Sequence, residues 1–140
     1  MTRDHGQALL ETILLGLLLM IPLVWLLSTL ADVHRSALAT TAAVRNAGAD
    51  AARATSLTAA GRAIDDAVAR ALADHGIAFA DARVRWTAPP ALRRGGAVEI
   101  EVSLPVSVLQ APFLGRIAGP SVWVHARHVA RIDLFRSRDG

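Results

Sequence analysis

The feature that most constrains this chain is a run of twenty residues, 12–31, without a single ionisable side chain. At a rise of about 1.5 Å per residue, a helix over this run is about 30 Å long, the thickness of the hydrocarbon core of a bilayer. The run therefore predicts one membrane-spanning helix. Pro22 lies inside it and removes one backbone hydrogen bond, so we expect a bend in the helix axis there.

The helical pattern continues beyond the apolar run. Apolar or small residues fall near one stripe, whereas the charged residues lie largely off it; the stripe is made of Leu30, Val33, Leu38, Thr41, Val44 and Ala51. The simplest interpretation is one helix over residues 7–53, half in lipid and half in water. The small residues between 37 and 52 would let another helix approach closely, although alanine is also simply a good helix former.

One carboxylic acid, Glu11, lies at the start of the apolar run, five positions after Gly6. A charged side chain costs about 2.5–3.5 kcal/mol at the centre of a membrane helix and less near its end, so Glu11 needs a partner. The residues up to Gly6 form a short polar leader. This pattern resembles a type IV prepilin processing site, where the leader ends in glycine and glutamate is the fifth residue of the mature chain.

The resemblance implies that a prepilin peptidase cuts between Gly6 and Gln7. The new amine of Gln7 would then lie one helical turn from Glu11 and could neutralise it, in the same subunit or in a neighbour. The alternative is an unprocessed signal anchor, in which Glu11 snorkels to the interface. A cleaved secretory signal is disfavoured, because the apolar run is longer than the usual stretch of about 7–15 residues.

Composition narrows the functional class. The chain has 140 residues, a net charge of +3, fifteen basic residues that are all arginine, and no cysteine. One domain beyond the membrane helix is the most it can form, and disulfides and thiolate metal sites are excluded. Because the arginines are scattered, we expect no nucleic-acid partner. Arg3 in the short leader favours a cytoplasmic amino terminus, although Arg35 lies just beyond the other end of the run.

The second half of the chain predicts another helix and then strands. Thr55 and Ser56 offer an N-cap and Gly76 a C-terminal stop, around an aliphatic stripe of Leu57, Ile64, Val68 and Leu72. The hydrophobic period then changes to two over residues 83–87, 98–108 and 122–134.

A turn at residues 93–96 would join the first two strands, with arginines facing glutamates across the hairpin. Pro105 indicates that the middle strand ends there or lies at an edge. We therefore expect an α+β fold: a long N-terminal transmembrane helix that continues outside the membrane, a second amphipathic helix, and a three-stranded antiparallel sheet.

A loose pattern in the strands accompanies this order of elements: Val98, Val102 and Pro105, then Val122, Val124, Ala126, Ala130, Arg131 and Asp133. With the leader and Glu11, it resembles the TadE-like pseudopilins, minor components of tight-adherence pilus systems, over nearly the whole chain. Members of that family often carry a disulfide pair, or a tyrosine next to the glutamate. This chain departs from the pattern, since it has neither cysteine nor tyrosine.

Candidate catalytic and metal residues are few. His125 and His128 lie three apart on a strand and point to opposite faces, so they cannot bind one metal ion together, and we expect His128 in the core. Asp65 and Asp66 are adjacent on the predicted helix, so their side chains diverge by about 100° and do not form a pair of carboxylates. We expect both at the solvated surface. There is no phosphate-binding loop or nucleophile elbow. We expect no enzyme, no metal, no cofactor and no small-molecule substrate.

The loop over residues 111–120 is apolar for a connection. Its bulky residues, Phe113, Leu114 and Ile117, either contact other pilus subunits or fold back over the edge of the sheet.

The expected function is that of a structural minor pilin: a leader over residues 1–6, a membrane and extended helix over 7–54, and an exported helix-plus-sheet domain over 55–140. It would span the inner membrane once, with a prepilin peptidase and other pilin subunits as partners. The alternative is an unprocessed, signal-anchored binding module of the cell envelope.

Overall fold

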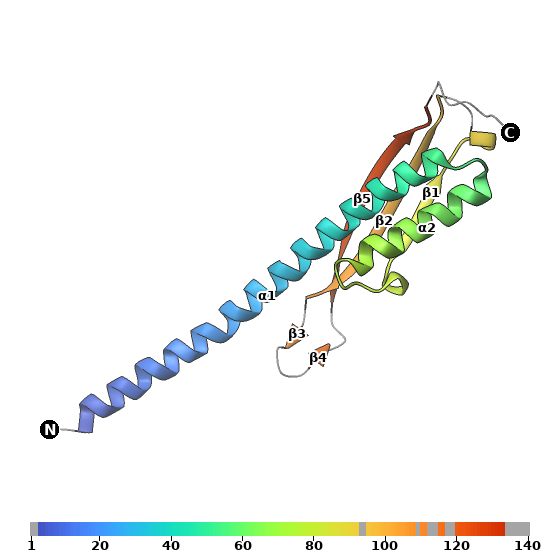
Figure 1. The fold of residues 1–140 in the computed structure, drawn as a ribbon. Coiled ribbons are helices and arrows are strands. Elements are labelled where there is room, and N and C mark those ends of the chain that lie inside the picture. Colours follow the sequence, from blue (N-terminus) through green and yellow to red (C-terminus); the bar gives the residue numbers. More distant parts are fainter. Residues whose placement is uncertain (1–2, 93–94, 109, 112–114, 117–119, 134–140) are drawn as a thin grey trace.

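In the computed structural model, a long helix runs out of a small head made of a second helix and a sheet (Figure 1). The structure describes residues 3–92, 95–108, 110–111, 115–116 and 120–133. The main elements are α1 (Arg3–Arg53), α2 (Leu57–Ala73), β1 (Arg83–Thr87), β2 (Ala97–Ser107) and β5 (Ser121–Arg131). The short ones are η1 (Phe79–Asp81), η2 (Pro90–Leu92), β3 (Gln110–Ala111) and β4 (Gly115–Arg116). The α+β prediction is confirmed.

Helix α1 is continuous from the apolar run into the head, as the sequence predicts, and it begins at Arg3, four residues before Gln7. Its first half projects away from the other elements, and its second half lies along the sheet (Figure 1). The helix is not interrupted at Pro22, and no sharp bend is visible along α1 in Figure 1. One missing hydrogen bond in a helix of 51 residues therefore does not break it here.

Helix α2 begins and ends at the predicted signals. The backbone N–H of Ala59 donates to Oγ of Ser56 at 3.1 Å, which is an N-cap bond. At the other end Gly76 has φ +70°, and the N–H of Ile77 reaches the carbonyl of Leu72 at 2.9 Å. This is the Schellman arrangement, in which glycine supplies the left-handed residue that ends the helix.

The buried face of α1 differs from the predicted stripe. The buried residues are Ala39, Thr40, Ala43, Val44, Ala47 and Ala51, whereas Leu30 and Leu38 are 62% and 50% exposed. The reason is close approach: a Cβ on Gly48 would lie 2.7 Å from Cδ2 of His128 on β5. Small residues thus mark the contact face of α1, and large ones have no room there.

The three strands form one antiparallel sheet in the order β1-β2-β5. Alternate residues of β2 are buried against the two helices; they are Val98, Ile100, Val102, Leu104 and Val106. Ile64, Val68 and Leu72 of α2 belong to the same core, as do the alanines of α1, so the core extends across the predicted division at residue 54.

Strand β2 does not end at Pro105, because it continues to Ser107 and stays paired with β5. Strand β1 pairs only with residues 99–103 of β2. Pro105 therefore lies where β2 has no β1 residue beside it, which satisfies the edge alternative of the prediction.

Candidate functional site

The first half of α1 is an exposed apolar surface. Its large aliphatic residues between 9 and 30 are 46–72% exposed, and no residue of its most apolar stretch is buried. Within the described residues, this is the one helix long and apolar enough to cross a membrane. Soluble monomers rarely expose so large an apolar surface, so lipid or another apolar helix has to cover it.

The hydroxyl groups in this half are satisfied within the helix. Thr12 and Ser28 donate to the carbonyls four residues earlier at 2.9 Å, and Thr29 does so at 3.0 Å. These groups can enter hydrocarbon without an unpaired donor. Glu11 is the single ionisable residue between 7 and 31, and it is exposed. It is therefore the polar side chain of this half that most needs a partner from outside the helix.

The predicted cleavage residues lie at the same end of α1 as Glu11. Gly6 and Gln7 are within the first turns of the helix. The first four N–H groups of a helix have no intrahelical acceptor, so this turn is the easiest one to unwind. Gln7 precedes Glu11 by four residues, so the two share one face of α1. The structure thus places three of the predicted site residues together, with Pro22 further along the helix.

The predicted contact residues Phe113, Leu114 and Ile117 lie outside the described residues. The described parts of their loop form a ribbon that the sequence pattern did not indicate: Gln110 of β3 pairs with Arg116 of β4, and Ala111 pairs with Gly115.

The outer face of the sheet carries a polar cluster that sequence reasoning missed. Oγ of Ser103 lies 2.9 Å from Nδ1 of His125, and Oε1 of Glu101 lies 3.8 Å from the same nitrogen. Since both contacts fall on Nδ1, the imidazole cannot pass a proton from Ser103 to Glu101, and the cluster does not form a catalytic triad. The pairing of Ser103 with His125 depends on strand register, which the sequence pattern does not provide.

Other side chains on this face are paired with one another. Arg127 binds Glu99 at 2.7 Å, and the guanidinium of Arg83 stacks on Trp123 at 4.2 Å from the ring centroid. Arg85 is directly opposite Glu101, as the predicted hairpin requires. His128 lies on the other face of the sheet, against Gly48 of α1. No group of three metal-ligating side chains occurs among the residues that the structure describes.

Comparison of the chain with protein-family models, curated proteins and solved structures finds no match. The class that the fold and the site define is an α+β protein with one candidate membrane-spanning helix near its amino terminus.

Proposed function

We propose that this chain is a structural pilin-like protein, similar to the TadE-like pseudopilins, which a prepilin peptidase processes between Gly6 and Gln7. The first half of α1 anchors it in the inner membrane, with the amino terminus in the cytoplasm and the head on the exported face. The same half of α1 packs against other pilin-type subunits. The observation that supports this best is Glu11, an exposed carboxylate at the end of an otherwise apolar helix surface.

A helix that serves only as a membrane anchor does not require this carboxylate. Apolar residues suffice for insertion, and a carboxylate in lipid is unfavourable unless a cation neutralises it. Cleavage after Gly6 would create such a cation at Gln7. Two unit charges 4 Å apart attract each other by about 4 kcal/mol at an effective dielectric constant of 20. A neighbouring subunit that supplies the amine would therefore be held in one register along the helix.

The rigid connection between the two halves of α1 suits an assembly role. The second half of α1 contributes Ala39, Ala43 and Ala47 to the core of the head. The register in which the membrane halves of two subunits pack would therefore also fix the position of one head relative to the other.

The first test is the intact mass of the protein extracted from its native membranes. We expect the mass of a chain that begins at Gln7, and we expect Gly6→Leu to keep residues 1–6. A wild-type chain that retains residues 1–6 would support the unprocessed, signal-anchored binding module instead.

The second test concerns assembly. The chain has no cysteine, so Leu14→Cys provides a single cross-linking site on the membrane half of α1. We expect oxidative cross-links between subunits in this background, and we expect Glu11→Leu to abolish them while membrane insertion is unchanged. Thr12→Val is the matched control, because it removes a neighbouring polar group without a charge. Equal cross-linking of the Glu11→Leu and Thr12→Val chains would refute the assembly role of Glu11.

A further inference from the structure

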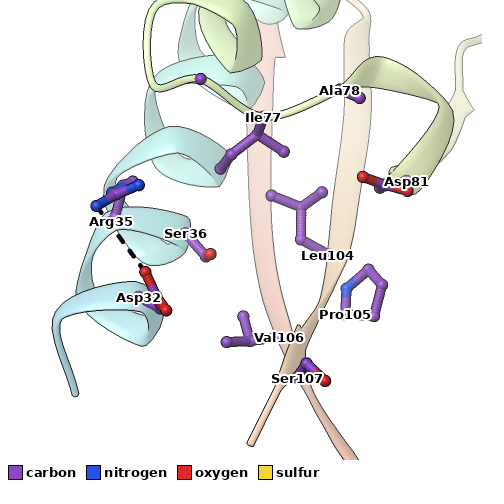
Figure 2. Close-up of a pocket in the computed structure, with 11 residues that line it drawn as sticks. Asp32, Arg35, Ser36, Ile77, Ala78, Asp81, Leu104, Pro105, Val106 and Ser107 are labelled. Atoms are coloured by element: carbon purple, nitrogen blue, oxygen red, sulfur yellow. Dashed lines mark ion pairs between the residues drawn. The ribbon is translucent and has the colours of Figure 1, made fainter. Parts of the chain in front are cut away.

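A cavity of about 380 Å³ lies where α1 leaves its apolar half (Figure 2). One wall is α1 and the opposite wall is the turn that follows α2 together with η1, while the end of β2 forms the floor. The lining residues that matter for its chemistry are Asp32, Arg35, Ser36, Asp81, Leu104 and Val106.

The position of the cavity along α1 indicates where it lies relative to the membrane. Asp32 is the first charged residue after the apolar run, and Ser36 follows it by about 6 Å along the helix axis. The headgroup layer on each side of a bilayer is about 5–8 Å thick. If residues 12–31 span the membrane, the α1 wall of this cavity lies at the level of the lipid headgroups. The inference therefore rests on the membrane anchoring in the proposed function.

The charges around the cavity are mixed and lie on different walls. Asp32 and Arg35 are on α1, and Asp81 is on the facing wall (Figure 2). Two carboxylates and one guanidinium leave a net charge of −1. The Asp32 and Arg35 side chains are 3.9 Å apart, with 28% and 58% of their surfaces exposed. Such a long, solvated ion pair is weak, so both groups can accept other partners.

The floor of the cavity is formed by the apolar residues Leu104, Pro105 and Val106 beside Ser107. Leu104 and Val106 are 2% and 4% exposed, and Ile77 packs against the core beside them. A ligand that fits this cavity therefore carries a cationic group, an anionic group and an adjoining apolar part. An anionic lipid lacks the cation and would meet a site that is already negative.

We propose that this cavity binds the headgroup of a zwitterionic aminophospholipid, with phosphatidylethanolamine as the example tested. The ammonium group binds to the carboxylate of Asp81 on the wall that faces α1, and the phosphate binds to Arg35 and to the hydroxyl of Ser36, which points into the cavity in Figure 2. The glycerol end of the lipid lies on the apolar floor. Because Arg35 lies on α1 and Asp81 on η1, one bound headgroup would bridge these two elements at the level of the membrane surface.

The test uses the full chain in nanodiscs of equimolar phosphatidylethanolamine and phosphatidylglycerol, released into detergent and analysed by native mass spectrometry. We expect wild type to retain phosphatidylethanolamine in preference to phosphatidylglycerol. Asp81→Asn should lower that retention about tenfold, because it removes one charge-assisted hydrogen bond. Asp81 is exposed, so the head stays folded. Asp66→Asn, an exposed change on α2 outside the cavity, is the matched control.

Equal retention by the Asp81→Asn and Asp66→Asn chains, or a preference for phosphatidylglycerol, would overturn the proposal. Alkaline extraction of native membranes separates this failure from that of the proposed function. A chain that alkali removes from the membrane overturns both the anchor and the lipid site. An integral, processed chain without lipid preference overturns the lipid site alone.

Discussion

The two halves of α1 are the same kind of secondary structure in opposite surroundings. In the first half the leucines and isoleucines are exposed, as Leu19 at 72% illustrates. In the second half the alanines that face the sheet and α2 are buried, and Ala39, Ala43 and Ala47 are fully so. The comparison shows that side-chain size, and not hydrophobicity alone, separates the two roles. Large apolar residues suit lipid or another membrane helix, whereas small ones allow a sheet and α2 to approach the backbone.

The largest expected effect comes from placing charge in the first half. The double substitution Leu15→Arg with Leu19→Arg should prevent membrane insertion, because an arginine costs about 2.5–3.5 kcal/mol at the centre of a membrane helix, close to Leu19, and a second one at Leu15 adds to that cost. Leu38→Arg with Thr41→Arg is the control in the second half, since both residues are exposed. Alkaline extraction of membranes is the measurement. If both double variants remain in the membrane pellet, the first half is not the anchor.

The next largest effect should come from truncating a large apolar side chain, and it should lower the free energy of unfolding only where that side chain is buried in the head. Ile64 is fully buried, so Ile64→Ala should lower the free energy of unfolding of the head by about 2–5 kcal/mol. Ile13→Ala removes the same atoms from a residue that is 61% exposed, and it should leave the unfolding of the head unchanged. Denaturant titration of the detergent-solubilised chains compares the two. A similar loss from both variants would mean that the membrane half of α1 is coupled to the head.

Much of the fold could be predicted from local patterns. The apolar run, the cap at Ser56, the glycine stop at Gly76 and the period of two in β2 are each determined by neighbours in sequence, and the structure agrees with them. The contact face of α1 could not be predicted correctly, because it depends on how closely β5 and α2 approach. The predicted stripe includes Val44 and Ala51, which are buried, but also Leu30 and Leu38, which lie off the buried face.

The candidate sites divide in the same way. Gly6, Gln7 and Glu11 are close in sequence, so their common helix end could be predicted. Asp32 and Asp81 line one cavity only because the turn after α2 returns to α1, and no local spacing indicates that.

A larger side chain in place of glycine should have a smaller effect than the changes above, and it should destabilise the head only from the second half of α1. Gly48→Val should destabilise the head by about 1–3 kcal/mol, because a Cβ there would lie 2.7 Å from the ring of His128 and 3.1 Å from Cβ of Ala130. Gly16→Val is the control, since a Cβ at that position has no atom within 4 Å other than those of its chain neighbours and of the helix backbone. Thermal unfolding followed by circular dichroism should show a lower midpoint for the Gly48→Val chain alone. An unchanged midpoint would mean that β5 can move away from α1 without loss.

The smallest expected effect concerns the ion pairs at the far end of the head. Arg70 follows Asp66 by four residues on α2, the spacing of a helical ion pair, but in the structure Nη2 of Arg70 donates to Asp50 of α1 at 3.2 Å. Arg53 also binds Asp50. The carboxylate of Asp50 is 27% exposed and both arginines are more exposed, so solvent screens these pairs. Asp50→Asn should therefore cost only about 0.5–1 kcal/mol of unfolding free energy.

Salt dependence distinguishes this ion pairing from packing. At an ionic strength of about 1 M the Debye length falls to about 3 Å, so the difference between wild type and Asp50→Asn should shrink. Asp66→Asn is the matched control, and it should have the smaller effect at low salt because the link between α1 and α2 runs through Asp50. Denaturant titrations at low and high salt give both comparisons. If Asp66→Asn were the more destabilising change, Arg70 would pair within α2, and the two helices would be joined by their core packing alone.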